Sequence, residues 1–336
     1  MKTVIKCAYC DGTAQLKKEI IDLVYRKENF KVVQHFYKCE QCQEDFTTNE
    51  ADAITLSQAH NQYREKYATP FPEEIIALKN KYELSAAKMG LVLGLGPNGF
   101  NKYENGEIPT TAIGNLLKAA ANPNIFLTLL EAVKEEFRAK EYDKLKDRII
   151  LLINSESDAN PYQLDLHKTP NAYNGFRVAD TEKLSNVIVA MISLSDPTFN
   201  DRLKINKLLF YADFVHYKRY GRSLTGITYR AIQHGPVPSK YGSIFNYLES
   251  EGIICSQWVE VGNKGGREVF QTNQNMEEVL FNEQELETIK DVINKFKDTP
   301  TWDMVTISHK ERGWIDHNND KNLISYQEYA FDLIGI

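Results

Sequence analysis

Four cysteines are the residues whose types and spacing most directly indicate chemistry. They form two C-x-x-C pairs, Cys7/Cys10 and Cys39/Cys42, with 28 residues between the pairs. Thiolates are soft ligands, and four of them complete the tetrahedral shell of a structural zinc ion at about 2.3 Å each. Redox chemistry is the alternative, but two pairs within one short segment with a weak core fit zinc better. We therefore predict one structural Zn²⁺ per chain in a closed site.

The remaining cysteine and several histidines are the other residues with reactive side chains. His35 lies close to the second pair, but four thiolates leave no vacancy, so we expect an ordinary strand residue. Cys255 stands alone, and we expect a buried apolar residue. His234, His309 and His317 raise the question of catalysis. No G-x-S-x-G, phosphate-binding glycine loop or H-E-x-x-H accompanies them, which predicts a protein that is not an enzyme.

The cysteine pairs need elements that bring them together. Residues 18–26 and 29–38 alternate apolar and polar side chains, which is typical of strands. A hairpin of these strands would place the second pair beside the first. Residues 52–68 are typical of a helix with one polar face. We expect residues 1–68 to form a zinc-binding head.

The stretch from residue 84 to 109 is a second candidate functional segment, because its pattern is typical of a helix-turn-helix. It predicts two short helices, at 85–93 and 97–105, with Ser85 as the N-cap of the first. Gly94 and Gly96 permit a tight turn between them, and Pro97 suits a first helical turn. Such a helix-turn-helix places its second helix in the DNA major groove, although an ordinary helical hairpin is the alternative. With helices at 73–81, 110–121 and 124–140, we expect a DNA-binding domain at 69–138.

Charge is spread unevenly over the 336 residues. Residues 1–118 carry 15 Lys/Arg and 15 Asp/Glu, whereas the rest carry 25 and 31 and hold the whole net charge of −6. The region expected to bind DNA is therefore neutral, although non-specific DNA affinity comes mainly from cations. Dimerisation would supply affinity by doubling the contacts.

The order of these features resembles that of the MqsA family of antitoxins over about residues 1–130. The most specific piece runs from Gly96 to Gly106, with the sequence GPNGFNKYENG. In that family an Asn and an Arg four residues later read base edges. The matching residues are Asn98 and Lys102, with Asn101 as a third candidate, and lysine lacks the planar fork of arginine. Gln43 stands where the family often has Gly. The resemblance implies a homodimer that binds a palindromic operator.

We expect a helix and a linker at 139–178. A further domain with its own hydrophobic core begins at about residue 179. Apolar periodicity predicts helices at 184–191, 203–220 and 286–296, and a further helix near 240–249. An extended segment at 227–231 precedes residues 234–238, which we expect to be a turn or loop. Segments 258–261 and 268–272 flank a glycine-rich stretch, which predicts a β-hairpin.

This region, 179–336, is similar to the Panacea family, the SocA-like antitoxin domain. The pieces that carry the similarity are Lys207 to Tyr211, Tyr229 to Ala231, Gly235 to Val237, Ser308 to Glu311, and Trp314. The family implies a mainly helical domain that binds and neutralises a toxin. Exposed aromatic side chains would anchor that complex, with Tyr217, Tyr220 and Tyr241 as candidates. The preferred interpretation of each of the three is a core or ordinary surface residue.

The sequence therefore predicts a mainly α fold with small β parts: a β-rich zinc-knuckle head, a Cro/repressor-type domain and a helical Panacea-like domain with a hairpin. We expect an antitoxin of a type II toxin–antitoxin system that represses its own operon. The alternative is a transcription regulator whose C-terminal domain senses another partner or a ligand. No stretch is apolar enough to span a membrane and no signal peptide is visible, so we expect a cytoplasmic protein.

Overall fold

The computed structural model describes residues 1–155, 166, 169–260 and 266–336, and its contacts group the chain into two units. The first unit combines residues 1–61 with 164–336, and the second comprises residues 62–163. The boundaries predicted at residues 68, 138 and 178 stay predictions. The sequence did not predict that residues 1–61 would pack with the C-terminal residues.

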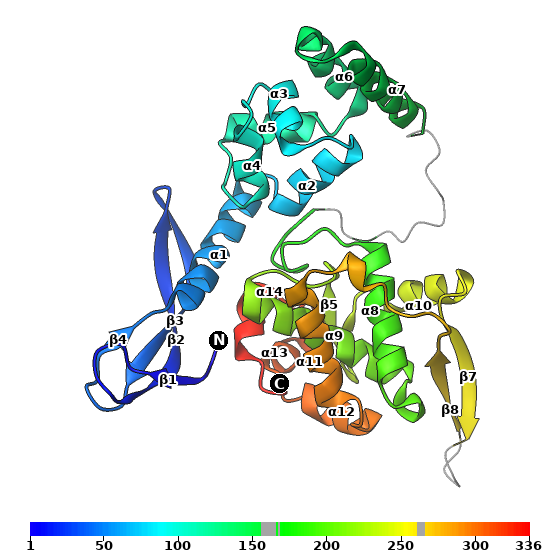
Figure 1. Cartoon of the computed structure of the whole chain (residues 1–336). Helices are drawn as coiled ribbons and strands as arrows, with labels where there is room; N and C mark the ends of the chain where they lie inside the picture. The colour runs from blue at the N-terminus through cyan, green and yellow to red at the C-terminus, as the bar shows by residue number, and fades with distance from the viewer. Residues whose placement is uncertain (156–165, 167–168, 261–265) are drawn as a thin grey trace. The chain divides into compact units, whose positions relative to one another are not determined.

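The first unit opens with an antiparallel sheet of strand order β1-β2-β3-β4. Its strands are β1 (Val4–Lys6), β2 (Thr13–Tyr25), β3 (Glu28–Cys39) and β4 (Asp45–Phe46). Arg26 and Lys27 join β2 to β3 with φ angles of +49° and +67°, as a two-residue hairpin turn requires. The long predicted hairpin is confirmed, and helix α1 (Asn49–Lys66) follows it (Figure 1).

The C-terminal part of this unit is mainly helical and packs around one buried helix. Its principal elements are α8 (Thr181–Leu194), α9 (Arg202–Tyr220), β5 (Tyr229–Ile232), β6 (Gly235–Pro238), α10 (Tyr241–Ser250), β7 (Cys255–Glu260), β8 (Gly266–Gln271), α11 (Glu283–Phe296), α12 (Thr301–Ser308), α13 (Arg312–His317) and α14 (Tyr326–Tyr329). Helix α9 contacts α8, α11, α12 and β6. Together with the N-terminal sheet, these elements confirm a mainly α fold with small β parts.

The structure corrects one prediction for this part, confirms a second and covers only part of a third. Gly235–Pro238, expected as a turn or loop, is strand β6, which pairs with β5. Prolines are tolerated there because the pair forms a two-stranded sheet in which β6 is an edge strand. The predicted hairpin of β7 and β8 is confirmed, although residues 261–265 of its connection lie outside the described residues. The predicted linker is also partly outside them, and Phe176 within it is fully buried.

Polar contacts join the hairpin and α1 to the C-terminal residues of the same unit. The Lys18 ammonium donates to the Phe331 carbonyl at 2.8 Å and also pairs with Asp332. The Asn61 amide donates to the Gly221 carbonyl at 2.7 Å. These contacts fasten both ends of the N-terminal segment to the C-terminal part.

The second unit is helical. Its elements are α2 (Pro72–Lys81), α3 (Ala86–Val92), α4 (Gly99–Glu104), α5 (Thr111–Ala119), α6 (Pro123–Ala132), a 3₁₀ turn η1 (Lys134–Glu136) and α7 (Ala139–Ser155). The helix expected over 124–140 is thus interrupted after Ala132. The second helix of the glycine-turn pair begins at Gly99 rather than Pro97. Phe100, Phe126 and Leu130 are fully buried in its core.

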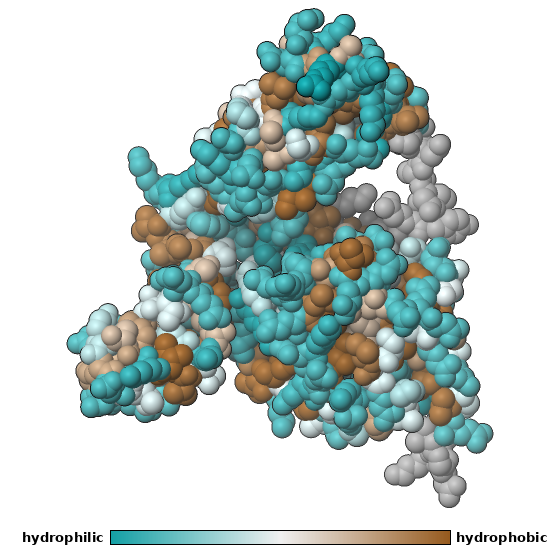
Figure 2. Space-filling view, in the orientation of Figure 1, coloured by the Kyte–Doolittle hydropathy of each residue, from teal (hydrophilic) through white to brown (hydrophobic). Residues whose placement is uncertain are grey.

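The surface is mainly hydrophilic on the face drawn in Figure 2, with apolar colour over the α6–α7 pair. By their accessible surface, Ile125 of α6 and Ile150 and Leu151 of α7 are exposed, Leu151 to 69%. Among the described residues, no helix combines the length and the hydropathy needed to cross a bilayer.

Gly221 gives a test of the contact between α1 and α9. It ends α9 with φ of +71°, and a Cβ there would lie 2.3 Å from the Ser57 hydroxyl oxygen on α1. We expect Gly221→Ala to lower the free energy of unfolding by about 1–3 kcal/mol, since it adds both strain and overlap. The measurement is urea unfolding followed by circular dichroism.

Gly242→Ala is the matched control, because nothing lies within 4 Å of a Cβ at this helical glycine. It should leave stability unchanged or raise it slightly. Equal stability of the two variants would show that α1 does not pack closely on the end of α9.

Candidate metal centre and nucleic-acid interface

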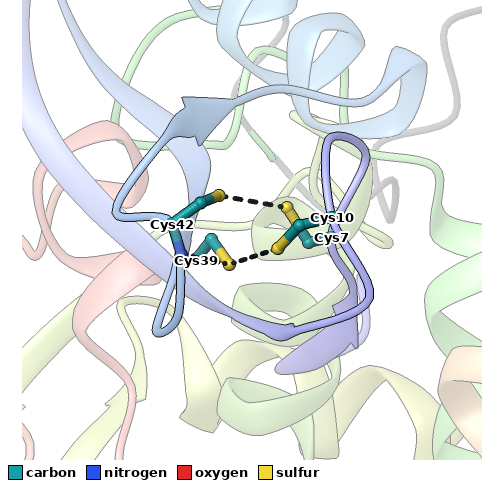
Figure 3. A group of neighbouring side chains, drawn as sticks. All are labelled: Cys7, Cys10, Cys39 and Cys42. Atoms are coloured by element: carbon teal, nitrogen blue, oxygen red, sulfur yellow. Dashed lines mark hydrogen bonds between the residues drawn. The ribbon is translucent and has the colours of Figure 1, made fainter.

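The four predicted cysteine ligands converge at one end of the N-terminal sheet (Figure 3). Cys7 and Cys10 lie in the turn between β1 and β2, while Cys39 ends β3 and Cys42 lies in the turn before β4. The register that pairs Ala14 with Cys39 brings the two turns together. All four sulfur atoms lie within 4.8 Å of one another. The β2–β3 hairpin therefore brings the second cysteine pair beside the first, as the sequence predicted.

The sulfur separations fit a metal site better than disulfides. The Sγ atoms of Cys7 and Cys42 are 3.7 Å apart, and those of Cys10 and Cys39 are 3.5 Å apart. A disulfide needs about 2.05 Å, whereas the edge of a tetrahedron with metal–sulfur bonds of about 2.3 Å is about 3.8 Å. Four cysteine thiols in this arrangement can hold one tetrahedral metal ion.

Backbone amides around the sulfurs favour the thiolate form that a metal requires. Tyr9 N–H donates to the Cys7 sulfur at 3.3 Å, and Cys42 N–H donates to the Cys39 sulfur at 3.4 Å. The Cys42 amide, opposed by burial and aided by the Gln41 amide, lowers the pKa of the Cys39 thiol to about 6. The amides therefore favour anionic sulfur at Cys39. At Cys42 the Glu44 amide lowers the pKa, but burial and the neighbouring sulfurs outweigh it and raise the pKa to about 12.

Gln43, which stands where the family often has Gly, is a strained position of the second turn. Gln43 has φ of +63°, in the left-handed region where glycine is the unstrained residue. Its side-chain amide donates to the Glu40 carbonyl at 2.8 Å, which partly offsets the strain. Gln43 removes no ligand from the cluster.

The other cysteine and the nearby histidine lie apart from the sulfur cluster. His35 lies on β3, as predicted, and its ring packs on Phe331 with the centroids 5.0 Å apart. Cys255, predicted to be buried, is exposed on β7. That prediction is wrong because β7 belongs to a two-stranded sheet and presents most of its side chains to solvent.

Helices α3 and α4 are held around the predicted glycine turn. Ser85 caps α3 by accepting from the Lys88 amide at 3.4 Å. Gly94 and Gly96 have φ of +67° and +75°, which confirms that the turn needs residues tolerant of this backbone. A Cβ on Gly90 would lie 2.2 Å from the Gly96 carbonyl oxygen, so α3 and the turn approach too closely for any side chain there.

The three predicted DNA-reading side chains lie on the exposed side of this pair. Asn98 precedes α4, and Asn101 and Lys102 lie within it; all three are exposed. Asn101 accepts from the Asn105 side-chain amide at 3.1 Å, which leaves Asn98 and Lys102 less constrained. Phe100, by contrast, is fully buried and packs the helix onto the core of its unit.

Two cationic side chains position α4 through contacts that the sequence did not predict. The Lys79 ammonium of α2 pairs with the Glu104 carboxylate of α4 at 2.6 Å. The Arg64 guanidinium donates to the Gly106 carbonyl just after α4 at 2.7 Å. The partners are far apart along the chain, so no local pattern could have revealed them.

His309 and His317 of the C-terminal part pack against aromatic side chains, and Tyr217 is buried. His309 stacks on Trp314 with ring centroids 3.8 Å apart, and His317 lies edge-on to Tyr329. Burial lowers the pKa of His309, and nearby Lys207 lowers it further. Tyr217 is fully buried, which agrees with its interpretation as a core residue and excludes it as an exposed anchor. The non-enzymatic reading stays a prediction.

Comparison with protein families matches two separate stretches of the chain. Residues 5–126 match the model described as the antitoxin component of bacterial toxin–antitoxin systems, MqsA. Residues 205–315 match the model of the antitoxin SocA-like Panacea domain. No curated protein matches the chain. The two matches confirm the pairing of antitoxin-type regions that the motifs predicted.

The metal site yields a test with an internal control. We expect Cys39→Ser to reduce bound metal in the purified protein from about one ion per chain to near zero, because three thiolates no longer close the site. The head should become protease-sensitive as a result. Metal is measured by mass spectrometry of the digested protein.

Cys255→Ser changes the same atom at an exposed position outside the cluster. It should leave the metal content unchanged. Equal metal contents in the two variants would contradict the assignment of the four cysteines.

Proposed function

We propose that this protein is an antitoxin of a type II toxin–antitoxin system that binds a protein toxin and represses its own operon. The observation that carries the proposal is the presence of two antitoxin-type family matches, at 5–126 and 205–315, on one chain. The three parts of the proposal are a zinc-held head, a DNA-reading helix and a toxin-binding C-terminal surface.

The ion in the cysteine cluster is proposed to be zinc. Four sulfur donors within 4.8 Å of one another suit a closed tetrahedral site, and zinc is the usual occupant of such a site. A full ligand shell leaves no open position for substrate. Its role is then structural, in keeping with a protein that acts by binding.

We propose that α4 reads DNA through Asn98 and Lys102. A side-chain amide can pair bidentately with adenine, and a lysine can donate to guanine O6 and N7. The pairing of Glu104 with Lys79 partly neutralises the one carboxylate of α4, which would otherwise repel phosphate. Asn101 is the third candidate at this surface.

Binding to a palindromic operator requires a second copy of the chain. A homodimer would double the contacts of a DNA-binding region that has no net positive charge. The exposed apolar side chains Ile125, Ile150 and Leu151 on α6 and α7 are our candidate contact with that copy.

We propose that the toxin binds at an exposed aromatic pair next to the β5–β6 turn. Trp302 of α12 is 64% exposed, and His234 lies edge-on to it with ring centroids 5.8 Å apart. Tryptophan is enriched among the residues that dominate binding energy at interfaces. This pair replaces Tyr217 as the proposed anchor.

The DNA-reading assignment is tested with Asn98→Ala. We expect operator binding to weaken by about 1–3 kcal/mol, since one bidentate base contact is lost. Fluorescence anisotropy with the DNA upstream of the gene measures the affinity. Asn115→Ala, at an exposed position on α5, is the control and should bind as the wild type does. Unchanged binding by an Asn98→Ala/Lys102→Ala double variant would reject α4 as the reading helix.

The toxin-binding assignment is tested in cells that express the toxin gene adjacent to this one. The full-length chain should restore growth, whereas Trp302→Ala should fail and should bind the toxin about 2 kcal/mol more weakly. Trp258→Ala, at a 67% exposed tryptophan on β7, should rescue normally. Full rescue by Trp302→Ala would remove this residue from the interface.

The same growth test distinguishes a toxin-neutralising C-terminal part from one that senses another partner or ligand. If residues 1–140 alone restore growth as well as the whole chain, the C-terminal part does not neutralise the toxin. The protein would then be a regulator whose C-terminal part senses another partner or ligand.

A further inference from the structure

The two edges of the β2–β3 hairpin differ in how they are covered. On the β3 edge, the Val33 amide donates to the Gln58 side chain of α1 at 2.8 Å, and Gln58 donates back to the Val33 carbonyl at 2.8 Å. On the β2 edge, β1 pairs only with residues 13–15, and the Leu16 amide then donates to the Thr3 carbonyl. Beyond Leu16, no described segment pairs with the outer edge of β2.

The direction of the backbone groups along β2 follows from the Leu16 bond. The Leu16 amide points to β1, away from β3. The N–H and C=O groups of every second residue share one side of a strand, so those of Lys18, Ile20 and Asp22 also point away from β3. The outward bonds of Val33 agree, because Val33 lies opposite Ile20 in the register. Among the described residues, no group beyond β3 bonds to these backbone atoms, so the edge can accept another strand.

Apolar and charged side chains alternate along this edge. Ile20 is 72% exposed and Val24 is 68% exposed, and the two lie on one face of β2 because they are even-numbered positions of the strand. Asp22 lies between them and Lys18 precedes Ile20, and both are exposed. An edge strand with exposed apolar side chains is a template for pairing with a further strand.

The order of these side chains suits a second copy of the same strand. We consider two antiparallel copies of β2 related by a two-fold axis at Ile20. Ile20 then lies opposite its own copy, and Lys18 of each chain lies opposite Asp22 of the other. At all these positions the backbone groups point to the second copy. Apolar side chains meet at the axis and opposite charges meet on either side of it, and both kinds of cross-strand pair are stabilising.

The neighbouring registers are less favourable. An axis at Lys18 or at Asp22 places that residue opposite its own copy, so that two like charges meet. An axis at Ile21 places Ile20 opposite Asp22. An axis at Glu19 places Ile20 opposite Lys18. An axis between two residues sets outward-pointing groups opposite inward-pointing ones, so no ladder of hydrogen bonds forms.

We propose that residues 18–22 of β2 pair with the same residues of a second copy of the chain, so that two N-terminal sheets join into one. The partner follows from the charge order of the edge, which is complementary to itself with an apolar residue at the axis. Lys18 already pairs with Asp332, and Asp22 with Lys31, so the new pairs extend existing ion pairs. This contact is separate from the one proposed on α6 and α7, and it does not rest on the antitoxin function.

Disulfide trapping in the full-length, metal-loaded protein tests the contact and its register. The background carries Cys255→Ser, which removes the exposed cysteine outside the cluster. Ile20→Cys should form a disulfide-linked dimer in a glutathione redox buffer, because opposed Cα atoms about 5.5 Å apart allow a disulfide. Asp22→Cys and Val24→Cys are the controls on the same face. Each lies at least about 13 Å along the strand from its own copy and should stay unlinked. Equal trapping at the three positions, or none at Ile20→Cys, would overturn the proposal.

Sedimentation velocity over a range of protein concentrations tests the contact without a new cysteine. Ile20→Lys places two ammonium groups opposite each other at the axis and should weaken self-association about fivefold or more. Val24→Lys is the matched control, because Val24 lies opposite Leu16, whose amide already bonds to Thr3. It should associate as the wild type does. Unchanged association of Ile20→Lys would contradict the pairing, and if that variant also fails in the growth test, the edge binds the toxin instead of a second copy.

Discussion

A helix buried on every side must supply partners for its own polar side chains, and α9 is such a helix. Four buried polar side chains of α9 have hydrogen-bond partners inside the fold: Lys204, Lys207, Asp213 and His216. Asp213 accepts from the backbone amides of Leu224 and Thr225 and from the hydroxyls of Thr225 and Tyr229, at 2.6–2.8 Å. A buried carboxyl without these donors would be strongly destabilising. The loop after α9 and strand β5 are thus fixed by the chemistry of one helix.

The N-terminal sheet depends on a different kind of support, because its own core is thin. Its buried cluster consists of Cys7, Ala14, Tyr37 and Cys39, and two of these are proposed metal ligands. So small a cluster supplies little hydrophobic stabilisation, which is the usual setting for a structural metal. The remaining support comes from the C-terminal part through Lys18 and α1. Metal and docking therefore stabilise the same strands at different positions.

Local sequence patterns predicted those structural features that are determined by residues close together in the sequence. The cysteine spacing, the alternation of β2 and β3, and the glycines between α3 and α4 each have a nearby physical cause. The sequence did not predict β6, because its prolines cannot donate in a ladder and indicate a turn. The exposure of Cys255, the burial of Tyr217 and the partnership of Lys18 with Asp332 depend on which distant segments meet. No alternation or motif in one segment carries that information.

The order of segments along the chain affects how the protein forms during synthesis. Residues 62–163 fold as one unit inserted between the two halves of the other unit. The cysteine turns and α4 are complete long before residues 327–332 leave the ribosome, yet those residues hold Gln58 and Lys18. Contacts of such long sequence separation form late and slowly. A nascent chain thus has an undocked hairpin for most of its synthesis, and chaperones or proteases meet that form first.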